Sequence, residues 1–140
     1  MEDIDYLVDT YLFKEDWHST KLAEPLAREY FQKLIDSNNV VVMREGAEAI
    51  GYLSIWWLDQ DQIARKLNGK DVHAVDENIT DGDFVFVSNA YVEPQHRNKK
   101  KINSLNQMMK DKHKDRDYVG IIYQNGYNKK EFSFYKKGEI

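Results

Sequence analysis

The sequence predicts a single α+β domain in which helices flank a central mixed sheet. Before Val40, apolar residues recur at helical spacing, and from Val40 onward they fall in the short runs that are typical of strands. A strand, a helix and a second buried strand then follow over 84–123, an order that makes a right-handed crossover between parallel strands. A chain of 140 residues has room for one core of ordinary size, so the expected domain is 1–140.

Two helices are expected before the sheet. One face of the first carries the apolar residues Ile4, Leu7, Val8, Tyr11 and Leu12. Ser19 and Thr20 are candidate N-caps of the second helix. Pro25 fits only in its first turn, and the polar residues 37–39 end it.

Four segments are expected to be consecutive strands: 40–43, 50–58, 84–92 and 118–123. The first three should be antiparallel neighbours and the last two parallel, because a helix connects only the last pair. Phe84 to Val87 are apolar on both faces, which indicates a central strand covered on both sides. Pro94 cannot donate a ladder hydrogen bond and ends that strand.

Three further helices are expected between and after these strands. A short one begins the polar segment 59–83, and the next runs over 97–112. The buried face of the latter should carry Ile102, Leu105, Met108 and Met109. A last helix is expected over 128–137, with Phe132 and Tyr135 on one side.

Composition excludes several classes of chemistry. The absence of cysteine rules out disulfides, a thiol nucleophile and cysteine-ligated zinc. No Walker loop is present, and His73 and His113 lack metal-ligand spacing, so no metal site is expected. No stretch reaches the roughly 18 apolar residues of a membrane span. The acidic N-terminus lacks the features of a signal peptide, so a cytoplasmic protein without membrane contact is expected.

The charges are unevenly distributed along the chain. Residues 1–93 carry eight basic and nineteen acidic side chains, a net charge of −11, whereas residues 94–140 carry twelve and five, a net charge of +7. This division indicates either two different ligand surfaces or a well-solvated basic helix. The acidic segment 59–83 either receives a cationic acceptor such as an amine or is simply solvated. Nucleic-acid binding is a weaker interpretation, because the isoelectric point is about 5.6.

Three segments, in the correct order, resemble motifs of the GNAT superfamily of N-acetyltransferases. Residues 40–53 look like the second and third strands of that family. Residues 92–105, which begin Val-Glu-Pro-Gln-His-Arg, resemble its pyrophosphate segment V-x-P-x-x-R-G-x-G-x-G-x-x-L. Residues 128–138 resemble its ending N-x-x-A-x-x-F-Y-x-x-x-G-F. The resemblance implies a GNAT-like sheet that lacks the family's C-terminal strands. The edge of strand 118–123 is then expected to be open to a partner or to a second copy.

The resemblance also implies a binding site for acetyl-CoA. The implied contacts are Val92, Arg97, Asn98, Lys99, Lys100, Lys101, Ile102 and Asn128. The basic turn lies at a predicted helix N-terminus, where exposed N–H groups and the helix dipole favour an anion. The alternative is a solvated basic turn. The sequence departs from the family at its three loop glycines, which are replaced here by Asn98, Lys100 and Ile102.

Two residues are candidates for catalysis. Tyr135 resembles the family's tyrosine that protonates the departing CoA thiolate, although an aromatic residue at such a position can equally belong to the core. Glu93 is the carboxylate nearest to the strand end, and Ser88 stands where the family often has a glutamate. Glu93 is therefore either a general base or an exposed charge.

The resemblance implies an N-acetyltransferase that moves an acetyl group from acetyl-CoA to an unidentified amine. The alternative is a catalytically inactive GNAT-fold structural or interaction protein, of phage origin. The altered glycine loop leaves the choice between enzyme and inactive relative open.

Overall fold

The computed structural model describes residues 2–15, 21–124 and 132–137. The helices are α1 (Asp3–Phe13), α2 (Glu24–Asp36), α3 (Gln60–Leu67) and α4 (Lys99–Lys112), and Pro94–His96 form the short 3₁₀ turn η1. The strands are β1 (Val40–Glu45), β2 (Glu48–Leu58), β3 (Phe84–Val92), β4 (Gly120–Gln124) and β5 (Phe132–Lys136). Within these described residues, no helix is long and apolar enough to cross a membrane.

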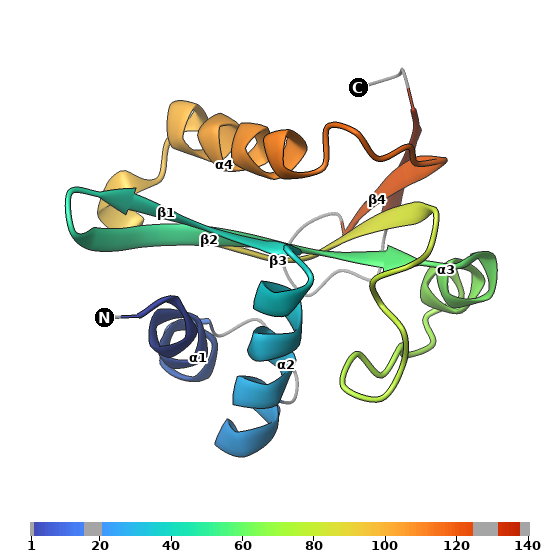
Figure 1. The fold of residues 1–140 in the computed structure, drawn as a ribbon, viewed down its shortest axis with the longest axis horizontal. Coiled ribbons are helices and arrows are strands. Elements are labelled where there is room, and N and C mark those ends of the chain that lie inside the picture. Colours follow the sequence, from blue (N-terminus) through green and yellow to red (C-terminus); the bar gives the residue numbers. More distant parts are fainter. Residues whose placement is uncertain (1, 16–20, 125–131, 138–140) are drawn as a thin grey trace.

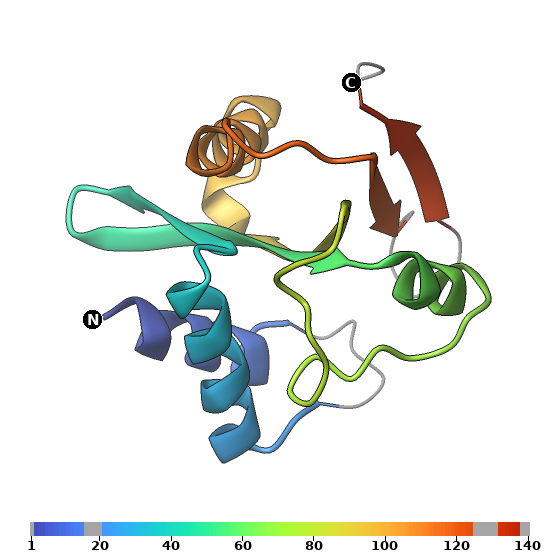
Figure 2. The same ribbon diagram turned by 45° about the vertical axis from the view of Figure 1, so that its right-hand side comes forward.

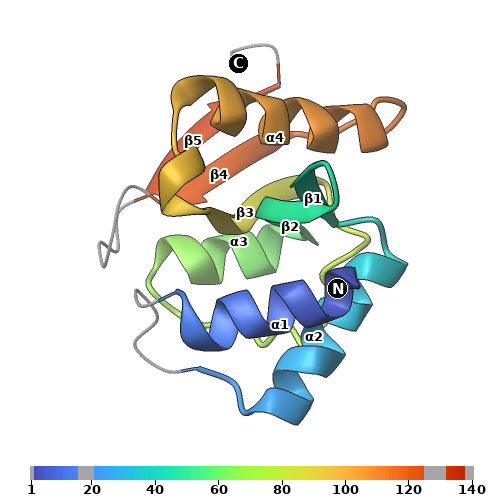
Figure 3. The same ribbon diagram turned by 90° about the vertical axis from the view of Figure 1, so that its left-hand side faces the viewer.

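The five strands form one sheet in the order β1-β2-β3-β4-β5. Only the β3–β4 pair is parallel, and the other neighbours are antiparallel. The four strands expected from the sequence, with their order and directions, are therefore confirmed. α1 and α2 cover one face of the sheet and α4 covers the other (Figure 1), while α3 lies on the side of α1 and α2 (Figure 3).

Each face of the sheet has its own apolar core. Phe31 and Leu34 of α2 pack with Tyr52 on one face, and all three are fully buried. On the other face Leu105 and Met109 of α4 pack against the sheet. β3 contributes to both cores, because successive side chains of a strand point to opposite faces. This confirms that β3 is a central strand covered on both sides.

The second helix begins later than the candidate caps suggested. α2 starts at Glu24, with Ala23 in the N-cap position, so Ser19 and Thr20 do not cap it. Ser19 and Thr20 themselves lie outside the described residues. Pro25 sits in the first turn, as expected, and its ring would clash with a carbonyl four residues earlier if the helix extended further upstream.

The C-terminal element is a strand where the sequence pattern favoured a helix. Phe132–Lys136 pairs antiparallel with β4, with Tyr135 opposite Ile121, and Figure 2 shows β5 alongside β4. The prediction of a helix over 128–137 is therefore wrong for its described part. The prediction of an open edge on strand 118–123 is also wrong, because β5 pairs with that edge. Aromatic residues favour strands, and β4 offers a row of backbone groups that β5 can pair with.

Ile102 is not buried, although its spacing predicted a place on the buried face of α4. Its side chain is 48% exposed, whereas Leu105 and Met109 are almost completely buried. The face toward the sheet follows the four-residue step from Leu105 to Met109. Ile102 lies seven residues before Met109, or about 20° from it around the helix, so it shares that face. Its exposure reflects its place in the first turn of α4 and not its direction.

Candidate functional site

β3 and β4 run side by side over a short distance and then diverge. They pair at three positions, the last being Phe86 with Ile122. β2 remains paired with β3 as far as Val92. In the described part of the chain, no strand lies beside β3 on the β4 side beyond Phe86. We call the divergence of β3 and β4 beyond Phe86 the fork.

Two residues of β3 direct their backbone groups toward the fork. The N–H of Glu93 donates to the carbonyl of Ile50 in β2 at 2.8 Å. Because backbone groups alternate in direction along a strand, those of Ala90 and Val92 point away from β2. The carbonyl of Val92 accepts a hydrogen bond from Nε of Arg97 at 2.7 Å. Among the residues that the structure describes, no other segment pairs with the remaining backbone groups of Ala90 and Val92, so they can pair with an extended ligand.

A β-bulge lies at the start of the fork. The register between β2 and β3 shifts after Ser54, which makes Ser88 an extra residue in β3. The Ser88 hydroxyl lies 2.8 Å from that of Ser54, and the Asn89 amide oxygen accepts a hydrogen bond from Tyr30 at 3.0 Å. Burial raises the pKa of Tyr30 to about 12, so its phenol remains a donor. The bulge redirects β3 beside the candidate site, a common position for bulges.

The basic turn that follows β3 divides its cations between two roles. Lys101 lies 2.7 Å from the carboxylate of Glu45, and its backbone N–H donates to the side chain of the N-cap residue Asn98. The side chains of Lys99 and Lys100 make no hydrogen bond or ion pair with any residue that the structure describes. Lys101 therefore helps to hold the turn, and Lys99 and Lys100 are available to an anion.

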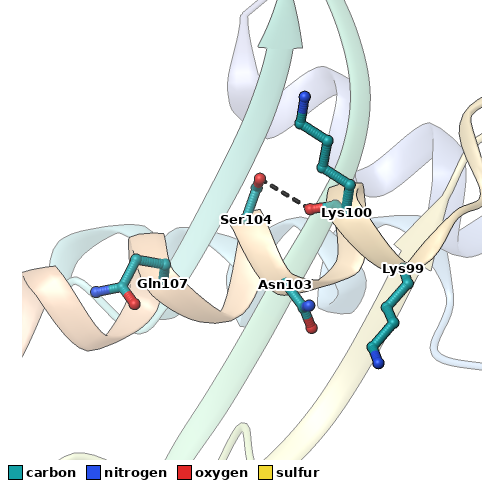
Figure 4. Close-up of a pocket in the computed structure, with 5 residues that line it drawn as sticks. All are labelled: Lys99, Lys100, Asn103, Ser104 and Gln107. Carbon is teal, nitrogen blue, oxygen red and sulfur yellow. Dashed lines mark hydrogen bonds between the residues drawn. The ribbon is translucent and has the colours of Figure 1, made fainter.

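An open depression on the outer face of α4 adjoins these two lysines. It is lined by Lys99, Lys100, Asn103, Ser104 and Gln107. The ammonium groups of Lys99 and Lys100 extend in different directions from the helix (Figure 4). The Ser104 hydroxyl donates to the carbonyl of Lys100 at 2.9 Å. The first turn of α4 thus carries two cations, on different sides of the helix, near the N–H groups at its start.

The side chains that stand where the GNAT motif has loop glycines do not distort the turn. Asn98 has an extended backbone, and Lys100 and Ile102 are part of α4. None of the three has a positive φ angle, and Asn38 is the one non-glycine residue with a positive φ among those described. The turn therefore needs no glycine for its conformation. What these side chains change is how closely a ligand can approach the backbone.

Glu93 is neither exposed nor isolated. Its side chain is 12% exposed, and its Oε1 accepts from Nζ of Lys14 at 2.6 Å and from the hydroxyl of Tyr6 at 3.3 Å. The Tyr91 hydroxyl lies 3.5 Å from Oε2. Burial, followed by the nearby Glu93, raises the pKa of both tyrosines. The interpretation of Glu93 as an exposed charge is therefore wrong: it is an anion enclosed by α1 and β3.

Tyr135 lies far from Glu93. It is opposite Ile121, which is level with Val85 in β3. Val85 precedes Glu93 by eight residues, which at about 3.3 Å per residue is roughly 26 Å along the strand. Tyr135 also shares the α4 face with Ile121, whereas Glu93 contacts α1. The structure therefore does not bring the two candidate catalytic residues together, and Asn128 lies outside the described residues.

No sequence motif singles out three residues near the candidate site: Tyr123, Tyr6 and Lys14. Tyr123 follows Ile122, the last residue paired with β3, and its ring centroid lies 5.8 Å from that of Tyr135. Burial raises the pKa of Tyr123. Tyr123 lies on a strand that the sequence predicts. Its place at the fork depends on where β3 and β4 diverge, which the local sequence does not show. Tyr6 and Lys14 reach Glu93 from a helix that is distant in the sequence.

Comparison with known proteins identifies the fold. No protein-family model matches the chain, and no curated protein sequence matches it. Two solved structures resemble it. One is a predicted acetyltransferase from Clostridium acetobutylicum with acetyl-CoA, at a TM-score of 0.60 and 19% identity over 89% of this chain and 75% of the other. The second is the ribosomal-protein-alanine N-acetyltransferase of Brucella melitensis, at a TM-score of 0.55 and 13% identity over 86% of this chain and 67% of the other. The chain therefore has a GNAT-like fold.

Proposed function

We propose that this protein is an N-acetyltransferase that moves an acetyl group from acetyl-CoA to an amine. The observation that carries the proposal is the fork, where Ala90 and Val92 present backbone groups to an extended ligand. The pantetheine arm of coenzyme A contains two amide groups, which can pair with a strand edge as an added strand does. The crystal structure of the similar Clostridium protein with acetyl-CoA supports the choice of ligand.

The turn that follows β3 suits the diphosphate of the same ligand. Arg97 uses Nε to bind the Val92 carbonyl, which leaves its Nη groups to face an anion. Lys99 and Lys100 add two charges at the N-terminus of α4, where the helix dipole favours phosphate. The main proposed contacts of the ligand are Val92, Arg97, Lys99 and Lys100. Asn98 and Lys101 shape the turn. Ile102 offers apolar surface to the ligand.

In the proposed reaction the acceptor nitrogen attacks the thioester carbonyl directly. A C–N bond forms, the C–S bond breaks, and the sulfur takes a proton from a phenol. Tyr135 and Tyr123 are the candidate donors, because their rings lie together on the α4 face, beside the fork. Tyr123 lies at the opening of the fork, and this position supports it as the donor nearer to the sulfur.

Calorimetry and thermal shift with acetyl-CoA and CoA test the proposal. Ligand at 100 times its Kd should stabilise the protein by about 2.7 kcal/mol. Release of CoA thiol in the presence of a primary amine then measures transfer. Replacing the tyrosine that donates the proton by phenylalanine should leave binding unchanged and slow turnover. The same change at the other tyrosine should leave both binding and turnover unchanged. Millimolar acetyl-CoA without heat or thermal shift at low salt would refute the proposal.

A further inference from the structure

Asn89 of β3 presents an unused amide group beside the fork. The residue is only 7% exposed. Its side-chain oxygen, Oδ1, accepts hydrogen bonds from the Tyr30 hydroxyl at 3.0 Å and from the Ser54 hydroxyl at 3.3 Å. Its nitrogen, Nδ2, donates to no atom of the residues that the structure describes, yet it is not one of the buried polar atoms that lack a partner. Nδ2 therefore reaches the surface of an otherwise buried side chain, with its N–H groups free to bind a ligand.

The two hydrogen bonds to Oδ1 fix the direction of this amide. Tyr30 reaches the oxygen from α2 and Ser54 reaches it from β2, while Trp56 donates from Nε1 to the Tyr30 oxygen at 3.0 Å. An amide carries its nitrogen on the branch opposite its oxygen, so Nδ2 points away from β2, and the flank of β3 away from β2 is the fork. The donors to Oδ1 also polarise the amide, which strengthens its N–H groups as donors.

The β-bulge sets the position of Asn89 along the fork. Asn89 pairs with Ser54, and Val87 pairs with the next residue of β2, so Asn89 is one β2 position beyond Val87. At about 3.3 Å per residue, Asn89 is roughly 7 Å beyond Phe86, where the fork begins. Tyr123 comes directly after the partner of Phe86 in β4. Asn89 and Tyr123 therefore differ in level by about one strand position.

The fork connects the two faces of the sheet on which these residues lie. Asn89 bonds to α2 on one face, whereas Tyr123 packs with the core under α4 on the other. A thioester in the fork can turn its sulfur toward Tyr123 and its oxygen toward Asn89, because both atoms are attached to the same carbon. We propose that Nδ2 of Asn89 donates a hydrogen bond to the thioester carbonyl oxygen and stabilises the negative charge that forms there during acetyl transfer. This role rests on the proposed function.

The reaction requires a donor at that oxygen. When the amine attacks, the C–N bond forms and an electron pair of the C=O bond moves to the oxygen. When the C–S bond breaks, that pair re-forms the C=O bond and the sulfur takes the phenol proton; the nitrogen then loses one proton to water and the phenolate regains one. An amide that is already fixed in place needs no reorganisation during these steps, and removal of such a donor lowers kcat about 100- to 1,000-fold in other enzymes.

The substitution Asn89→Asp tests the amide nitrogen. The aspartate can still accept the hydrogen bonds of Tyr30 and Ser54, but it has no N–H to donate. We expect kcat to fall about 100- to 1,000-fold, while the Kd for CoA and the KM for the amine stay within about twofold of the wild type. Infrared spectra of bound acetyl-CoA, labelled with ¹³C at the carbonyl, should show a lower C=O frequency in the wild type than in the variant, because a hydrogen bond weakens that bond.

The substitution Asn68→Asp is the matched control. It removes an exposed amide that donates to the carbonyl of Ala64 at 2.8 Å, at the end of α3, and kcat should not change. Asn89→Ala serves in the same measurements if Asn89→Asp does not fold. An unchanged kcat for the Asn89 variant, or a loss of kcat without a difference in the C=O frequency, would overturn the inference, since the latter result would make Asn89 a structural residue.

Binding of acetyl-CoA to the wild type separates this inference from the proposed function. Binding and transfer that survive Asn89→Asp overturn the inference alone and leave the acetyltransferase proposal standing. A wild type that does not bind acetyl-CoA refutes both.

Discussion

Replacing Arg97 by alanine should weaken CoA binding strongly, because the side chain serves two purposes. It binds the Val92 carbonyl through a 2.7 Å hydrogen bond, and in the proposed function its remaining donors bind the diphosphate. A hydrogen bond to a charged group contributes about 1.5 to 3 kcal/mol. At 1.4 kcal/mol per factor of ten, Arg97→Ala should raise the Kd for CoA about 10- to 150-fold.

Lys101→Ala is the matched control in the same turn. Its ammonium is paired with Glu45 at 2.7 Å, and the two side chains are 29% and 59% exposed. A pair of this kind contributes about 0.2 to 1 kcal/mol, so Lys101→Ala should raise the Kd no more than about fivefold. Both proteins should show wild-type circular dichroism, because neither side chain belongs to a core.

Isothermal titration with CoA at two salt concentrations measures both effects. The screening length falls from about 10 Å at 0.1 M salt to about 3 Å at 1 M. Wild-type affinity should therefore fall steeply with salt, and the Arg97→Ala affinity less steeply, since one charge is missing. Equal affinities for the two variants, or a wild-type affinity independent of salt, would contradict the assignment of the diphosphate to this turn.

Two further predictions concern stability. Hydrogen bonds from Arg65 and from the His73 backbone lower the pKa of Glu77 to about 2 from 4.5, so this carboxylate stabilises the fold above pH 4.5 and loses its effect as the pH falls toward 2. Urea unfolding of Glu77→Gln should show a deficit at pH 6 that disappears near pH 2. A Cβ at Gly82 would lie 2.0 Å from the Leu58 backbone, so Gly82→Ala should cost more than about 3 kcal/mol. Gly69 has open space around it but a left-handed backbone, so Gly69→Ala should lower the free energy of unfolding by about 1 kcal/mol. Equal losses for the two substitutions would contradict the close contact at Gly82.

The sequence alone determined the helix-strand order of most of the chain and the place of the basic turn after β3. Pro94 ends β3 because it lacks an N–H, and the apolar step from Leu105 to Met109 defines the face of α4 toward the sheet. These features depend on neighbours within a few residues. Local spacing is therefore sufficient to predict them.

Other features were decided by contacts between distant segments. The aromatic residues of 132–136 fit a helix as well as a strand, and pairing with β4 selects the strand. The fork depends on where two parallel strands diverge, after the contact of Phe86 with Ile122. Lys14 meets Glu93 from across the fold. No local period encodes these meetings, because they result from how separately formed elements pack together.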